Sequence, residues 1–75
     1  MYKVTILDSS KKNIRTYEHI NKIAYTTIMD TTVVEGDDIL THSFSLEFPL
    51  HLYSDTGNYL ISSSIIGALE IEKEL

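Results

Sequence analysis

The side chains best suited to hold a metal ion are three histidines, His19, His42 and His51. None lies two or four residues from another, and the chain has no cysteine, so no pair has the spacing of a zinc ligand set. His42 lies in the apolar phase of an alternating segment. We therefore predict no metal or other cofactor, and we interpret His42 as a core or rim histidine with one hydrogen bond.

The tripeptide Asp55-Thr56-Gly57 matches the catalytic loop of aspartic proteases, in which two such carboxylates share one proton. In that family apolar residues precede the aspartate and a small residue follows the glycine, whereas Tyr53-Ser54 and Asn58 stand here. Asp, Gly and Asn are also ordinary turn residues. The sequence has neither a glycine-rich phosphate loop nor a serine elbow. We predict a turn at 54–58 and no enzymatic activity.

Three basic residues, Lys11, Lys12 and Arg15, cluster near a predicted turn. With nearby tyrosines, such a cluster can contact phosphate and stack on bases. However, residues 1–29 hold five bases and two acids (+3) and residues 30–75 hold one base and nine acids (−8), giving a net charge of −5. An acidic chain binds nucleic acid poorly. A solvated hairpin is the preferred interpretation, and a small-barrel nucleic-acid-binding protein is an alternative.

Tyrosine dominates the aromatic residues, with five tyrosines, two phenylalanines and no tryptophan. A tyrosine has an apolar ring and a polar tip, which suits the margin of a core or of an interface. Tyr53 lies on the outward phase beside the turn at 54–58, and Tyr59 follows the same turn. We predict that these two form an exposed pair across the hairpin and a contact surface for another protein.

The clearest strand pattern runs from Ile39 to Tyr53, where apolar residues alternate with mostly polar ones. This period of two is typical of a strand with one buried face. One unbroken strand of this length is too long for so small a domain. Because proline lacks a donor for the ladder, we predict two strands separated at Pro49, Ile39–Phe48 and Leu50–Tyr53.

The remaining segments also favour strands. A helix over Tyr17–Met29 competes with the strand assignment there, but the run of Tyr and Thr favours a strand. Gly36 beside two aspartates predicts a hairpin, and Gly67 predicts a bulge or a close approach of backbone. Besides a short segment at Val33 and Val34, the further predicted strands are Tyr2–Asp8, Ile14–Glu18, Ile23–Met29, Tyr59–Ile61 and Ala68–Glu74, with a turn at 8–13.

These elements predict a single all-β domain over residues 1–75, a small antiparallel barrel or sandwich of six to seven short strands. Asp8 and Asp55 open two similar hairpins, so an internal pseudo-repeat is a further hypothesis. The chain does not start with an apolar run, so we predict no signal peptide and a cytoplasmic location. The composition predicts no membrane segment.

The predicted function is that of a non-enzymatic protein-interaction module. A short chain without disulfides buries a small core, and open sheet edges invite pairing. We therefore expect a homodimer or a higher closed oligomer, with another protein as a further partner. A second alternative is an acidic inhibitor of phage or plasmid type that mimics nucleic acid.

Overall fold

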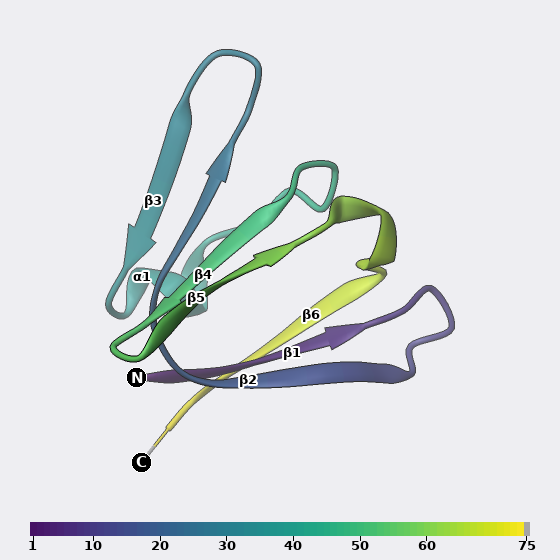
Figure 1. The fold of residues 1–75 in the computed structure, drawn as a ribbon, viewed down its shortest axis with the longest axis horizontal. Helices are drawn as coiled ribbons and strands as arrows, with labels where there is room; N and C mark the ends of the chain where they lie inside the picture. The colour runs from purple at the N-terminus through teal and green to yellow at the C-terminus, as the bar shows by residue number, and fades with distance from the viewer. Residues whose placement is uncertain (75) are drawn as a thin grey trace.

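The computed structural model describes residues 1–74, which form one antiparallel sheet with a short α-helix and a 3₁₀ turn (Figure 1). The sheet order is β5-β4-β2-β1-β6, and β3 pairs with β2 as well. This confirms the predicted all-β class. Within the described residues the sheet is not closed into a barrel, because β5 and β6 each pair with one strand only. The elements are β1 (Tyr2–Leu7), β2 (Asn13–Thr26), β3 (Thr31–Glu35), α1 (Asp38–Thr41), β4 (Leu50–Ser54), β5 (Gly57–Ile61), η1 (Ser63–Ile65) and β6 (Ala68–Lys73).

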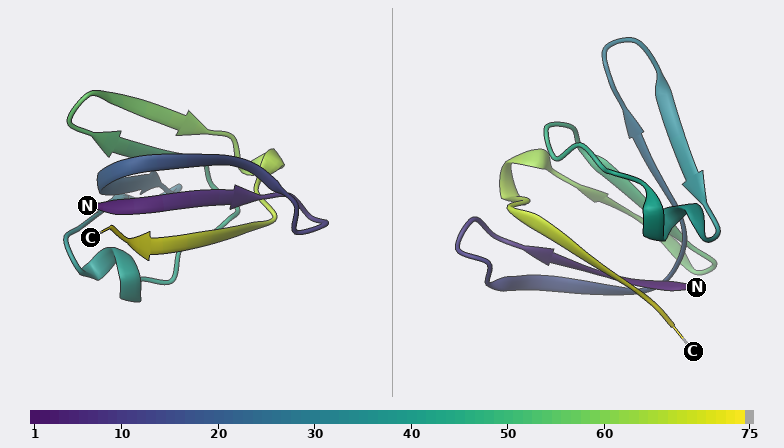
Figure 2. Two further views of the ribbon diagram at one scale, coloured as in Figure 1. Left: turned by 90° about the horizontal axis from the view of Figure 1, so that it is seen from below. Right: turned by 180° about the vertical axis from the view of Figure 1, so that it is seen from behind.

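Strand β2 joins the two halves of the sheet. Its first part pairs with β1, and its last part pairs with β4 on one edge and β3 on the other. Register shifts lie on both sides of Ile20, and His19 has a left-handed φ of 60°. Such β-bulges bend a strand and increase its twist. The bend turns β2 from one half of the sheet into the other, so that the halves face each other across the core (Figure 2).

The two strands predicted at Ile14–Glu18 and Ile23–Met29 are therefore one strand, and the alternative helix over Tyr17–Met29 is wrong. The polar residues between them, His19 and Asn21, lie at the bulges rather than in a connecting loop. Strand pairing on both edges of the last part of β2 outweighs the helical spacing of its apolar residues.

The predicted strand Ile39–Phe48 is also wrong. Residues 38–41 form α1, and residues 42–49 form no strand, so that only the segment after Pro49 becomes β4. The apolar residues of this segment still meet the core, because Ile39 is buried in α1 while Phe44 and Leu46 pack against the core from the loop. The hairpin predicted at Gly36 is absent, since Gly36 with φ of 61° leads β3 into α1.

The core fills the space between the halves of the bent sheet. Val4, Ile20, Ile23, Leu50 and Leu52 are completely buried, and they come from the three central strands β1, β2 and β4. The two predicted hairpins at Asp8 and Asp55 are present. The segments that follow them differ, because β2 continues without a break after the first hairpin, whereas η1 separates β5 from β6 after the second. The internal pseudo-repeat stays a hypothesis. None of the helices formed by residues 1–74 has the length and apolar character needed to cross a membrane.

Gly67, just before β6, makes the close backbone approach that the sequence predicts. A Cβ atom on Gly67 would lie 2.3 Å from the carbonyl carbon and oxygen of Asp8 and 2.5 Å from the amide nitrogen of Ser9. The Gly67 amide also donates to the Leu7 carbonyl at 2.7 Å. Only glycine fits here, and this contact fixes where β6 begins relative to β1.

Candidate interaction site

Strand β6 pairs with β1 along one edge and has a free edge on the other side among the described residues. The Glu74 amide donates to the Met1 carbonyl at 2.9 Å, which continues the register in which Glu72 faces Lys3. Residues that bond to the neighbouring strand alternate with residues that do not. The backbone groups of Leu69 and Ile71 therefore point away from β1, toward the free edge.

This free edge opens onto a groove whose lining side chains are mostly apolar, while backbone polar groups are also accessible in it. The groove has a volume of about 420 Å³ and lies between β6 and the segment of α1 and the following loop, residues 39–46. Leu69 and Ile71 line it from the strand, while Leu40, Phe44 and Leu46 line it from the opposite wall. The site thus combines unpaired backbone groups with a concave apolar surface, which is the combination that an added strand needs.

His42 supplies the polar side chain of the groove and belongs to an aromatic cluster with Tyr25 and Phe44. The Tyr25 hydroxyl and His42 Nε2 are 2.9 Å apart, and the ring centroids of His42 and Phe44 are 4.7 Å apart. All three side chains are half-buried. The predicted rim histidine with one hydrogen bond is confirmed, although His42 lies in a loop and not on a strand.

The two tyrosines predicted as a contact pair, Tyr53 and Tyr59, are not cross-strand neighbours. Tyr53 pairs with Asn58, and Tyr59 pairs with Leu52 on the opposite face. Tyr53 faces outward and lies under the Lys22 ammonium, 4.9 Å from the ring centroid. Tyr59 faces inward and lies 4.8 Å from the ring of Tyr17. The expected pair is wrong, because a pairing of Tyr53 with Tyr59 requires one more residue between the two strands than this hairpin has.

The predicted basic cluster, Lys11, Lys12 and Arg15, is exposed at the β1–β2 hairpin. Its turn is built as the sequence predicts, since one Asp8 carboxylate oxygen accepts bonds from the amides of Ser10 and Lys12, both at 2.9 Å. The Arg15 guanidinium lies 5.2 Å from the ring centroid of Tyr17. Tyr25 is not beside this cluster, because it lies in the last part of β2, opposite Leu50 and Thr32, whereas Arg15 lies opposite Ile6 of β1.

Asp37, in the acidic segment after β3, links three parts of the fold. It accepts hydrogen bonds from the Tyr2 hydroxyl on β1 and from the Lys73 ammonium at the end of β6, the latter at 3.2 Å. The bond from Tyr2, and then the bond from Lys73, lower the pKa of Asp37 below its usual 3.8. The same bond to Asp37, with burial, raises the pKa of Tyr2 to about 12.

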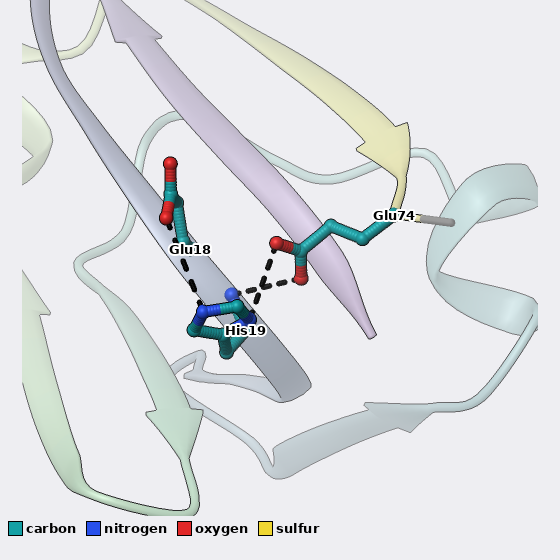
Figure 3. Close-up of side chains that lie close together, drawn as sticks. All are labelled: Glu18, His19 and Glu74. Atoms are coloured by element: carbon teal, nitrogen blue, oxygen red, sulfur yellow. Dashed lines mark hydrogen bonds and ion pairs between the residues drawn. The ribbon is translucent and has the colours of Figure 1, made fainter.

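A further cluster, Glu18, His19 and Glu74, joins the bulge of β2 to the end of β6 (Figure 3). The His19 amide donates to Glu74 Oε1 at 2.9 Å, and Nδ1 lies 3.2 Å from Oε2. The other ring nitrogen lies 3.9 Å from Glu18. One imidazole nitrogen and two carboxylates could hold a divalent cation, but the contacts present are those of a clasp that anchors β6. Sequence spacing gave no signal for it, because His19 and Glu74 are 55 residues apart.

Comparisons of this chain with protein-family models, with curated proteins and with solved structures found no match.

Proposed function

We propose that this chain is a non-enzymatic protein-interaction module that binds an extended polypeptide segment by adding it as a strand to the free edge of β6. The observation that carries the proposal is that the outward backbone groups of Leu69 and Ile71 lie beside an apolar groove. In strand addition, backbone hydrogen bonds supply affinity and the groove accepts alternate side chains.

The test is titration of the protein with a short peptide of alternating valine and threonine, followed by amide chemical shifts. The expected shifts fall on β6 and on the loop of residues 39–46. Leu40→Glu, in the groove wall, should weaken binding, because Leu40 is 45% exposed and a charge would enter the apolar groove. Leu60→Glu is the matched control, since Leu60 is 66% exposed on the distant strand β5. Equal effects of the two variants would contradict the proposal.

Self-association is a second candidate activity, and the β2–β3 hairpin supports it. At its tip Ile28 is 95% exposed and Met29 is 91% exposed. The tip is a tight turn, in which the Thr27 amide donates to the Asp30 carbonyl at 2.8 Å and the Asp30 amide donates to the Thr27 hydroxyl at 3.3 Å. Two adjacent apolar side chains held away from the core mark a contact surface. We propose that a homodimer or higher oligomer covers them.

The two alternatives from the sequence stay separate proposals. The Arg15–Tyr17 contact supports nucleic-acid binding through the hairpin that carries Lys11 and Lys12, and the net charge of −5 supports mimicry of nucleic acid. A gel shift that weakens steeply with salt would favour the first. Salt-sensitive capture of a nucleic-acid-binding protein, without any gel shift, would favour the second. A cytoplasmic location remains a prediction.

A further inference from the structure

We infer that the strand accepted by the free edge of β6 alternates basic and apolar residues; this inference rests on the proposed function. An added strand places one set of its side chains beside Leu69 and Ile71 and the other set beside Glu70 and Glu72, because paired residues in a sheet share a face. Leu69 and Ile71 line the groove, whereas both glutamates are exposed. Apolar residues are therefore required on the first face and cations are favoured on the second.

Strand β1 shows part of this pattern on the other edge of β6. Lys3 lies opposite Glu72, with its ammonium 3.5 Å from the carboxylate. Val4 lies opposite Ile71, and both side chains point into the protein. The same alternation of side chains is presented to a strand on the free edge. Within residues 1–74 Glu70 forms no ion pair, since its partner in β1 is Thr5, so it is available to a cation from outside.

Two of the registers in which a second copy of β6 could pair with this edge place glutamates opposite each other. When two such strands pair antiparallel about Ile71 with their faces matched, Glu70 of one copy lies opposite Glu72 of the other. Pairing about Glu72 places that residue opposite itself. Like charges directly opposite each other destabilise a sheet, and charged edge residues commonly prevent such self-pairing. The two glutamates therefore disfavour a second copy and favour a basic strand from another protein.

The test compares three short peptides of equal length, in which valine alternates with lysine, threonine or glutamate. We expect the lysine peptide to bind about tenfold more tightly than the threonine peptide at low salt, from two favourable cross-strand charge pairs. The difference should shrink as salt screens these exposed charges. The glutamate peptide should not bind. Two further lysine peptides carry N-methyl groups on alternate residues, one on the odd positions and one on the even positions. They should differ in affinity, because only one of the two sets of methyl groups blocks the backbone bonds to β6.

Charge reversal on β6 supplies the decisive variant. Glu70→Lys should remove the preference for the lysine peptide and allow the glutamate peptide to bind, whereas Glu35→Lys, the same change on exposed β3, should leave the preference intact. If the threonine peptide binds as tightly as the lysine peptide and Glu70→Lys changes nothing, the inferred partner chemistry is wrong while strand addition stands. If no peptide binds, both the inference and the proposed function are overturned.

Discussion

Replacing Gly67 with alanine tests the close approach that sets the start of β6. The added methyl group would lie 2.3 Å from the carbonyl carbon and oxygen of Asp8, well inside the contact distance of two carbon atoms, which is about 3.5 Å or more. The obstructing atoms belong to the backbone, so no side-chain rotation can relieve the clash. Either β6 or the β1–β2 turn must move.

The expected cost is about 3 kcal/mol, at the upper end of the range for adding a methyl group to a closely packed site. A domain of 75 residues has a free energy of unfolding of about 4–11 kcal/mol at typical stabilities per residue. With a urea dependence of about 1 kcal/mol per molar for so small a protein, the unfolding midpoint should fall by about 3 M. Gly67→Ala should therefore lose a large share of its stability.

Urea unfolding followed by circular dichroism measures this loss, and the other two glycines are controls. At Gly57 an added Cβ meets nothing within 4 Å and φ is ordinary, so Gly57→Ala should stay within about 1 kcal/mol of wild type. Gly36 also has open space, but its φ is 61°, so Gly36→Ala should cost about 1–2 kcal/mol from backbone strain. A Gly67→Ala protein as stable as Gly36→Ala would refute the reasoning.

Three further predictions concern the bond between Tyr2 and Asp37, the tip of the β2–β3 hairpin and the bulge of β2 at His19. As pH rises from 10 toward 12 the native protein should lose stability that Tyr2 contributes, because the bond to Asp37 raises the pKa of Tyr2 to about 12; Tyr2→Phe should lack that decline in a pH series of urea midpoints. Because the pKa of Asp37 is lowered from 3.8, the Asp37 carboxylate contributes folding stability that is fully present above pH 3.8. This stability is lost as the pH falls through the lowered pKa. Ile28→Ser/Met29→Ser should reduce the mass measured by light scattering, and the urea midpoint should fall only by the concentration-dependent share that association contributes. His19→Gly should gain about 1 kcal/mol from the left-handed φ but lose the imidazole contacts of the clasp, while its backbone amide still donates to Glu74, so the unfolding midpoint should change little.

Matched substitutions separate these effects from general ones. Lys11→Gly relieves a similar φ of 62° without breaking a clasp, so it should stabilise the protein by about 0.5–1 kcal/mol. If Lys11→Gly gained less folding stability than His19→Gly, that result would contradict a stabilising role for the clasp. Ile14→Ser removes a half-exposed apolar residue far from the tip and should leave the mass unchanged. A wild-type mass of 8.5 kDa would disprove self-association.

Local sequence rules predicted the parts of the fold that depend on neighbouring residues. The alternation in Tyr2–Leu7 and Ala68–Lys73 gave β1 and β6 within one residue at each end. Asp8 bonds its own turn, and Gly67 makes the backbone approach that its position indicated. Pro49 marks the start of β4. For Asp8 and Pro49 the constraint lies in the covalent geometry or in contacts between residues close in sequence, whereas Gly67 indicated a close approach without indicating that Asp8 is its partner.

The errors arose where contacts between distant residues decide the structure. Of the alternating apolar residues in Ile39–Phe48, Phe44 and Leu46 meet the core from a loop, whereas Leu40 is exposed and Ile39, outside that alternation, is buried in α1. A short helix followed by a loop therefore replaces the predicted strand without any partner strand. Likewise, no spacing rule places Leu69 beside Phe44 or His19 beside Glu74. The groove could not be predicted, because its two walls come from residues 39–46 and from β6, which meet only after the sheet has bent.

The free edge of β6 is held in place at both ends, which matters for its proposed role. Gly67 fixes the start of the strand against Asp8, and at its other end Lys73 binds Asp37 while Glu74 binds His19. An edge that is already ordered loses little conformational freedom when a strand is added, so more of the gain from backbone bonds appears as affinity. Loosening either end should therefore weaken peptide binding even where no anchoring residue touches the peptide. The same glutamates that disfavour pairing of β6 with itself about Ile71 or Glu72 would then decide which strand it accepts.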